Sequence, residues 1–563
     1  MNIFNSVKVR NFKRQKFNLS HSVRLTTEFG RLTPVLCEPV LPADKFKIST
    51  MLKVDFAPMT FPVMERFKVY LHYFFVPNRL LWSQWEEFIT GGESGTAEIP
   101  YPVIKLGDNY EEYEGGNLLF SRFKTGSLFD YLGFPALNTR ADIDVSRIAT
   151  YPKYFDALPF KAYQLIYNEW YRDQNLEDAF DIQPDKNGNQ SFEDTNDSFV
   201  NRLMLIQYRA WKKDYFTSAL PDPQRGPDVT LPLVGDIDIH YRQLDAVTDP
   251  DFPGTRLRSS TGGNVSDSQL YNKQNADDHT NGLLTSGLGG TFDVYDVDNS
   301  KNLYGDGSSM RSATINEVRR AFAIQRLYEL AARVGGRYME NILGNFGVRA
   351  GDARLQRPEY LGGSVIPVMV GDVLQTSETT EDGTPLGMPA GVAGGAGQVK
   401  EFTKHFTEHG WIIGILSVLP EATYMQGIPR KFLKRDRFDF AWPLLANIGE
   451  QEIQQQELYF NVNGTNELNN AGFGYAPRYS EYKFGLNSIH GDFRNTLADF
   501  HDARIFESAP ALNKSFIQVK PTSSSKGLNR IFAVTSESYD HIWVNLYNDV
   551  LVKRKLPKYG TPI

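Results

Sequence analysis

The sequence contains a single cysteine, Cys37, among 563 residues. One thiol cannot form a disulfide within the chain, and it excludes a zinc site built from several cysteines. Long hydrophobic runs are also lacking, since the longest, around residues 411–419, is far shorter than the roughly 20 residues that span a bilayer. The first residues lack the apolar core of a signal peptide. We therefore expect a protein of a reducing compartment that neither spans a membrane nor carries a signal peptide.

Aromatic residues and turn formers are abundant instead. Aromatic residues make up 13% of the chain, which also has 46 glycines and 30 prolines. This composition is typical of short β-strands joined by many turns rather than of a helical bundle. The length alone would suggest several domains, but an all-β chain can carry long insertions on one core. The composition therefore predicts a mainly β sandwich or barrel with insertions.

Residues 57–92 have a clear local pattern. From 67 to 75 apolar side chains alternate with Lys, Tyr and His, which predicts a half-buried strand. Asn78 is a candidate helix cap, and apolar residues at helical spacing follow over residues 81–89. Gly91 is a typical helix stop. The pattern predicts a strand, a turn and one short helix.

The same segment, APMTFPVMERFKVYLHYFFVPNRLLWSQWEEFITGG, resembles the major capsid protein of the gokushoviruses, small tailless bacteriophages of the Microviridae. Further stretches in the style of that family follow in the family's order along nearly the whole chain. They are FNLSHSVRLTTEFGRLTPVLCEPVLPADKFKI, LPFKAYQLIYNEWYRDQNL, KKDYFTSALPDPQRGP, RPEYLGGS, EHGWIIGILSVLPEATYMQGIPR, GFGYAPRYSEYK and RKLPKYGTP. No family motif can be placed over residues 228–310.

The resemblance implies a viral jelly roll, an antiparallel eight-stranded β-sandwich or barrel, as one domain over residues 1–563 with long inter-strand insertions containing some helices. It implies a structural protein without catalytic residues, of which about sixty copies close into a T=1 icosahedral shell around circular single-stranded DNA. An internal scaffolding protein, a DNA pilot protein and a bacterial surface receptor are the other implied partners. We expect assembly in the host bacterial cytoplasm and a final location in the virion. Segments 56–62, 420–429 and 442–443, rich in proline and aromatics, are candidate subunit contacts.

Residues 228–310 form a predicted surface insertion. Between Asp236 and Asp306 stand twelve Asp and five Lys or Arg, a balance of −7 that equals the net charge of the whole chain. Frequent Asn, Gly and Ser are typical of long surface loops. The resemblance suggests a protrusion for host attachment, and a tolerated, solvated loop is the alternative. The run DVYDVD at 293–298 lacks the glycine and terminal glutamate of a calcium-binding EF-hand loop.

Basic residues gather near both ends of the chain, in an N-terminal arm of residues 1–17 and in the C-terminal tail. The candidate DNA-facing residues are Lys8, Arg10, Lys13, Arg14, Lys16, Lys553, Arg554, Lys555 and Lys558. Such side chains neutralise phosphates, and the neighbouring rings of Phe12, Phe17 and Tyr559 can stack unpaired bases. The alternative is a solvated surface or protection of strand edges. Residues 541–555, before the tail, alternate like a strand.

Two segments have helical periodicity. Thr314 and Glu317 fit a capping box, and an apolar stripe continues to Tyr338 with a kink expected at residues 335–336. Residues 160–175 carry a second stripe, which is aromatic. Such stripes usually pack in the core, and here they serve equally well as a contact between subunits. We assign them no chemistry.

One pattern is catalytic in form. His405, Glu408 and His409 match H-x-x-E-H, in which two histidines on a helix bind zinc and the glutamate acts as the base of a hydrolase. The apolar run that follows favours a strand, where the histidines would lie about 13 Å apart, too far for one zinc ion. Residues 391–397 are glycine-rich but lack the Gly-Lys-Ser/Thr ending of a P-loop. We expect no metal and no cofactor, and a jelly-roll carbohydrate-binding protein is the other alternative.

Overall fold

The structure is a computed structural model. It describes residues 13–105, 118–136, 154–191, 198–227, 229, 314–349, 351–374 and 389–559, together with short strands between residues 238 and 306. Contacts divide the chain into two compact units, one of Met1–Arg225 with Glu329–Ile563 and the other of Gly226–Tyr328. In the part of the chain that the structure describes, no helix is long and apolar enough to cross a membrane.

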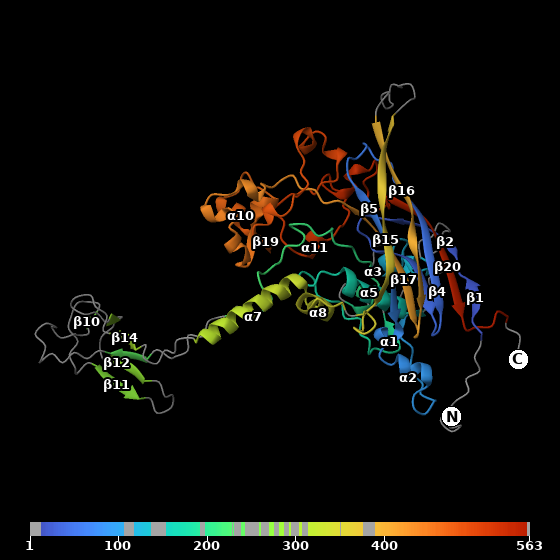
Figure 1. Cartoon of the computed structure of the whole chain (residues 1–563), viewed down its shortest axis with the longest axis horizontal. Helices are drawn as coiled ribbons and strands as arrows, with labels where there is room; N and C mark the ends of the chain where they lie inside the picture. Colours follow the sequence, from blue (N-terminus) through green and yellow to red (C-terminus); the bar gives the residue numbers. More distant parts are fainter. Residues whose placement is uncertain are drawn as a thin grey trace, which may run out of the picture. The chain divides into compact units, whose positions relative to one another are not determined.

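The larger unit is built on one curled antiparallel sheet (Figure 1). The strand order is β1 (Gln15–Asn18), β20 (Ile542–Arg554), β4 (Lys45–Phe56), β16 (Pro389–His405), β15 (Glu359–Leu374), β5 (Phe67–Pro77), β17 (Gly410–Pro420) and β3 (Thr33–Val40). β2 (His21–Thr27) pairs with β20 beside β1, so these two short strands share one position at the edge. The sheet thus has eight strand positions, and the predicted jelly-roll class is confirmed.

The two halves of this sheet are buried differently. β5 and β17 are buried on both faces along much of their length, whereas β4 and β20 largely alternate between buried and exposed residues. The inward side chains of both halves form the main core, which includes Phe46, Val69 and Val544. A strand covered on both faces becomes continuously apolar, and one covered on a single face alternates. Among the described residues, the outward side chains of β20 and β4 are therefore mostly exposed.

Short helices and a small sheet cover the outer face of β5 and β17. These elements are α1 (Asn78–Leu81), α2 (Trp85–Thr90), β6 (Val103–Lys105), α3 (Leu118–Phe123), α4 (Leu128–Tyr131), β7 (Tyr154–Asp156), α5 (Leu158–Ile166), the π-helix η3 (Tyr167–Tyr171), β8 (Asn189–Ser191) and α6 (Phe199–Leu203). Phe74 and Ile413 of the sheet join a second core with Trp82 and Phe160. The predicted aromatic stripe at 160–175 is thus core packing.

The predicted helix after β5 is two helices. α1 ends at Leu81 and α2 begins at Trp85. Asn78 does not cap α1, because Pro77 takes the cap position and no side chain bonds to the first turn. Gly91 ends α2 in the left-handed region, at φ 76°, as predicted.

The predicted capping box begins helix α7 (Ile315–Val334), where Thr314 Oγ1 accepts from the Glu317 backbone at 3.2 Å. The helix ends at Val334 instead of kinking, because Gly335 takes φ +108°, and α8 (Tyr338–Phe346) follows. Among the described residues, the apolar stripe is largely exposed instead of packed in a core: Phe322 is 64% exposed. In the smaller unit, β9 (Asp238–Tyr241) pairs with β14 (Leu303–Asp306), β10 (Arg258–Ser259) with β13 (Phe292–Asp293), and β11 (Leu270–Gln274) with β12 (Asn281–Thr285).

The segment between β17 and β20 is mostly turns around a third, smaller core. Its elements are η6 (Arg430–Phe432), η7 (Arg437–Asp439), η8 (Pro443–Asn447), β18 (Glu450–Gln454), α9 (Gln455–Leu458), α10 (Asn466–Asn470), β19 (Gly472–Pro477), η9 (Ser480–Tyr482), η10 (Gly491–Arg494), η11 (Ala498–Phe500), α11 (Lys514–Ile517) and η12 (Leu528–Ile531). β18 and β19 form an antiparallel hairpin.

Candidate functional site

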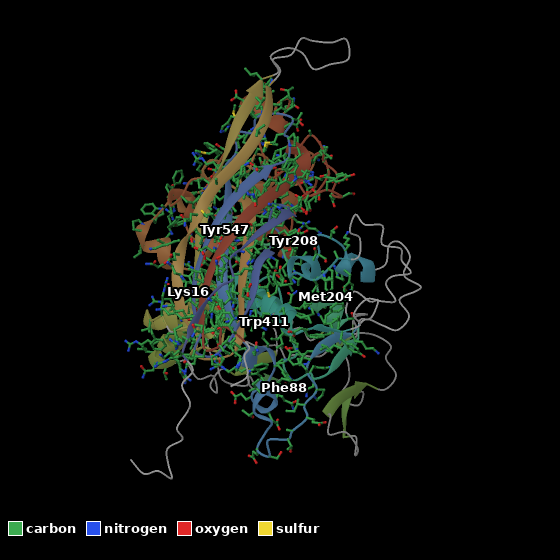
Figure 2. All side chains as sticks on the ribbon, turned by 90° about the vertical axis from the view of Figure 1, so that its right-hand side faces the viewer. Lys16, Phe88, Met204, Tyr208, Trp411 and Tyr547 are labelled. Atoms are coloured by element: carbon green, nitrogen blue, oxygen red, sulfur yellow. The ribbon has the colours of Figure 1, made fainter. Side chains whose placement is uncertain are left out.

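Basic residues from the two ends of the chain meet at one corner of the sheet. Lys16 on β1 lies opposite Lys553 on β20, which in turn lies opposite Lys45 on β4. Arg14 Nη2 is 2.8 Å from Nε2 of His405, at the end of β16. Like charges at directly opposite strand positions repel each other, so an anion bound there relieves the repulsion. We call Arg14, Lys16, Lys45 and Lys553 the basic corner; Figure 2 labels Lys16 within it.

The other predicted residues are distributed differently. Lys8 and Arg10 lie outside the described residues. Lys13 is exposed just before β1. Lys555 and Lys558 follow β20, and Lys558 Nζ lies 5.7 Å from the centre of the Tyr559 ring.

Arg554 lies on the opposite side of β20 from Lys553. Its Nε is 2.8 Å from Oδ2 of the buried Asp44, and its guanidinium lies 5.4 Å from the centre of the Phe46 ring. It also donates to the Pro39 carbonyl at 2.5 Å. Arg554 therefore stabilises the subunit from inside. Sequence analysis missed Lys45 and grouped Arg554 with its exposed neighbour, although alternation along a strand separates residues 553 and 554.

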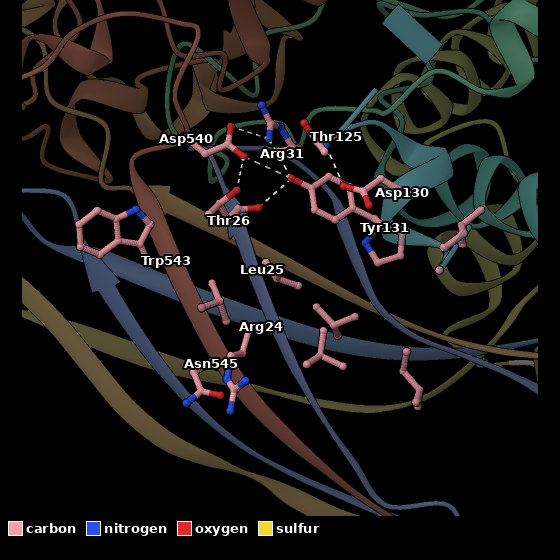
Figure 3. A pocket seen from close by; sticks show the side chains of 18 of the residues that line it. Arg24, Leu25, Thr26, Arg31, Thr125, Asp130, Tyr131, Asp540, Trp543 and Asn545 are labelled. Atoms are coloured by element: carbon pink, nitrogen blue, oxygen red, sulfur yellow. Dashed lines mark hydrogen bonds and ion pairs between the residues drawn. The ribbon is translucent and has the colours of Figure 1, made fainter. Parts of the chain in front are cut away.

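A cleft of about 1180 Å³ lies along β2, β3 and the start of β20. On its wall, Arg31 Nη1 is 2.9 Å from Asp540 Oδ1, and Thr26 Oγ1 donates to Asp540 Oδ2 at 2.7 Å (Figure 3). The Tyr131 hydroxyl donates to the Thr26 carbonyl at 2.7 Å. Burial raises the pKa of Tyr131 above its usual value, which keeps the hydroxyl protonated as a donor. These polar groups bind one another and tie α4 and the loop before β20 to β2, which is a structural role.

The three residues of the zinc-like pattern do not converge. His405 ends β16 and bonds to Arg14, while His409 lies in the turn before β17 with its ring centre 5.4 Å from that of Trp85. Glu408 is 2.6 Å from the Nε of Arg79. The segment is a turn between strands, neither the helix that zinc binding needs nor one continuous strand. Among the described residues, no cluster of His, Cys, Asp and Glu is suited to a metal ion.

Residues 5–563 match the family described as "Capsid protein (F protein)". The chain belongs to this family of capsid proteins. It is 31% identical to capsid protein VP1 of Chlamydia phage 1, over 100% of this chain and 97% of the relative. It is 33% identical to VP1 of Bdellovibrio phage phiMH2K, over 98% and 95%, and 29% identical to VP1 of Spiroplasma virus 4, over 99% and 97%.

These relatives confirm the gokushovirus resemblance over the whole length of the capsid protein. They make it a structural protein of the virion, a subunit of a multi-copy shell around a phage genome. Neither the carbohydrate-binding nor the zinc-hydrolase alternative gains support from them.

The capsid protein exposes large apolar side chains in the turns between β17 and β18. Within these apolar turns, defined as residues 430–448, Leu444 is 89% and Trp442 51% exposed. Phe432, Phe438, Phe440 and Ile448 are exposed in the same segment. Several large apolar side chains exposed in one segment are typical of an interaction surface. Of the predicted contact segments, 442–443 is exposed, whereas Phe56 and Tyr424 in the other two are buried.

Proposed function

We propose that about sixty copies of this capsid protein close into a T=1 icosahedral shell around circular single-stranded DNA. The main support for this proposal is the apolar turns. Side chains as exposed as Leu444 are removed from water when a second copy covers them, which favours association. Assembly takes place in the cytoplasm of the host bacterium, with an internal scaffolding protein and a DNA pilot protein as partners.

Electron microscopy of gradient-purified protein tests this, with expression alone and together with the other proteins of its source genome. Uniform closed shells are expected in at least one condition. Monomers in both conditions would contradict the proposal. Shells only on co-expression would show that assembly requires at least one of the co-expressed proteins.

The basic corner is proposed to face the packaged DNA, together with Lys13, Lys555, Lys558 and the predicted arm residues Lys8 and Arg10. Lysines and arginines at exposed positions bind phosphate without reading sequence. Alanine replacement of Lys16 and Lys553 should lower the affinity of the subunit for single-stranded DNA and flatten its dependence on salt. An unchanged salt dependence would exclude these lysines as phosphate contacts.

The predicted insertion, residues 228–310, is proposed to be a surface protrusion that contacts a bacterial receptor. Its support is the charge balance of −7 between Asp236 and Asp306 and the compactness of the unit Gly226–Tyr328. Replacement of residues 236–306 by a short glycine-serine linker should leave shells intact and abolish adsorption to the host. Particles that still adsorb would show that the receptor contact lies elsewhere.

A further inference from the structure

One face of the sheet remains uncovered in the described subunit. The outward side chains of β20 and its neighbours β2 and β4 form this face, and Figure 2 looks onto it with Tyr547 labelled. Trp543 is 47% and Tyr547 40% exposed, although the residues between them alternate into the core. The β5–β17 half of the same sheet is covered by helices. Two large rings thus stand in water on an otherwise well-packed strand.

The pairing register places cations between these two rings. Asn545, midway between Trp543 and Tyr547, lies opposite Arg24 on β2 and opposite Lys53 on β4. Directly opposite residues of an antiparallel pair share one face, so ring, cations and ring form successive rows along β20. The two rings are four residues apart, about 13 Å at 3.3 Å per residue, which leaves room for further nucleotides between two stacked bases.

The charges of this face are available to a ligand. Lys53 Nζ is 2.9 Å from Asp55 Oδ2, but both side chains are largely exposed, and surface ion pairs of this kind are weak enough for a phosphate to compete. Arg24 is exposed. In the close view of the cleft, Trp543, Arg24 and Asn545 lie apart from the network around Arg31 and Asp540 (Figure 3). Further along the same face of β20, Asp549 accepts a hydrogen bond from Ser20 Oγ at 3.0 Å, and Lys553 follows in the basic corner.

We propose that a single strand of DNA lies along β20 on this face, with bases stacked on Trp543 and Tyr547 and phosphates bound by Arg24, Lys53 and the basic corner. The inference rests on the proposed function, because it supplies the inner contact of a DNA-filled shell. Alternating rings and cations are the combination that binds unpaired strands without reading their sequence. A protein partner would favour a mainly apolar patch with fewer charged side chains.

The test uses the full-length subunit and a fluorescein-labelled oligothymidylate, with affinity read from fluorescence anisotropy at several salt concentrations. Trp543→Ala and Tyr547→Ala should each weaken binding about tenfold and leave the salt slope unchanged, because stacking releases no counterions. Lys53→Ala should instead reduce the slope by about 0.7, the value for one phosphate contact on a single strand. Trp543→Phe and Tyr547→Phe, which keep a ring, should retain most of the affinity. Tyr154→Ala, at an exposed tyrosine on β7, is the matched control and should bind like the parent.

Two results would overturn the inference. One is parental affinity in both ring-to-alanine variants. The other is loss of shells in those variants with unchanged oligonucleotide binding, which would make the face a contact between copies. Electron microscopy of the parent protein distinguishes failure of this inference from failure of the proposed function. If the parent forms shells but the ring variants bind DNA normally, the proposed function stands and only the stacking surface is refuted.

Discussion

Asp44 and Arg554 form an ion pair of 2.8 Å between residues 510 positions apart in the chain. The Asp44 side chain is almost fully buried and that of Arg554 is mostly so. The pair links the end of β20 to the loop before β4, while the neighbouring residue Lys553 points outward.

Neighbouring residues 553 and 554 should therefore behave differently when changed to alanine. Arg554→Ala leaves the Asp44 carboxylate buried without its partner and should lower the free energy of unfolding by about 3 kcal/mol. Lys553→Ala should change it by less than about 0.5 kcal/mol, as is usual at an exposed site. Urea denaturation of both purified variants measures the difference. Equal effects would mean that Arg554 contributes no more than a surface residue.

Subunit stability should fall as the pH rises from about 4 to about 7, because of the Asp502 carboxyl. Burial raises the pKa of Asp502 to about 7, and Arg530, whose Nη1 is 3.5 Å away, offsets this only in part. Burial likewise raises the pKa of Glu65 to about 7. A folded-state pKa above the unfolded value means that the folded form holds its proton longer, so this stabilisation is complete below the unfolded pKa and lost by pH 7. Denaturation series at pH 5 and pH 8 should show the fall.

Asp502→Asn tests the origin of this pH dependence. The amide cannot ionise, so the difference in stability between pH 5 and pH 8 should shrink relative to the parent. Asp499→Asn is the control, because residue 499 lies on the nearby turn η11 but is exposed. A parental pH difference in Asp502→Asn would place the titrating group elsewhere.

The apolar turns should affect assembly and not folding. Trp442→Ala should leave the unfolding midpoint of the isolated subunit nearly unchanged and reduce the yield of shells in electron micrographs. Tyr424→Ala should instead destabilise the subunit itself. Tyr424 is buried and its hydroxyl donates to Asp214 at 2.7 Å, so its loss should lower the free energy of unfolding by about 3 kcal/mol. A destabilised Trp442→Ala subunit would show that Trp442 supports the fold.

Zinc should not bind at the H-x-x-E-H pattern. The parent and His405→Ala should take up equally little zinc in equilibrium dialysis, because Glu408 is paired with Arg79 and the two histidines contact different groups. Stoichiometric zinc in the parent that disappears in the variant would contradict this.

Local patterns in the sequence were sufficient for much of the sheet. Alternation predicted β5 and β20, and Thr314 with Glu317 predicted the start of α7. The break between α1 and α2 was not predicted, since the apolar spacing continues across it. The exposed stripe of α7 was not predicted either, because periodicity shows that a helix has an apolar face but not what covers it.

The candidate site was harder to predict for a physical reason. Each basic cluster is visible in the sequence, but their meeting depends on β1 pairing with β20 across most of the chain, and no local pattern encodes such a register. The same pairing of β20 with β4 places Lys45 in the basic corner and Arg554 next to its partner Asp44.

The position of β20 also has a consequence for synthesis. This strand is made after the other strands of the sheet, yet it lies between β4 and the pair β1 and β2, which are made among the first. Until residues 542–554 are made, β2 and β4 each lack the neighbour that pairs with one of their edges. The long stretch of chain between β4 and β20 must then be closed before these contacts form. A chain that stops before residue 542 would therefore lack the strand that joins β4 to β1 and β2 in one sheet.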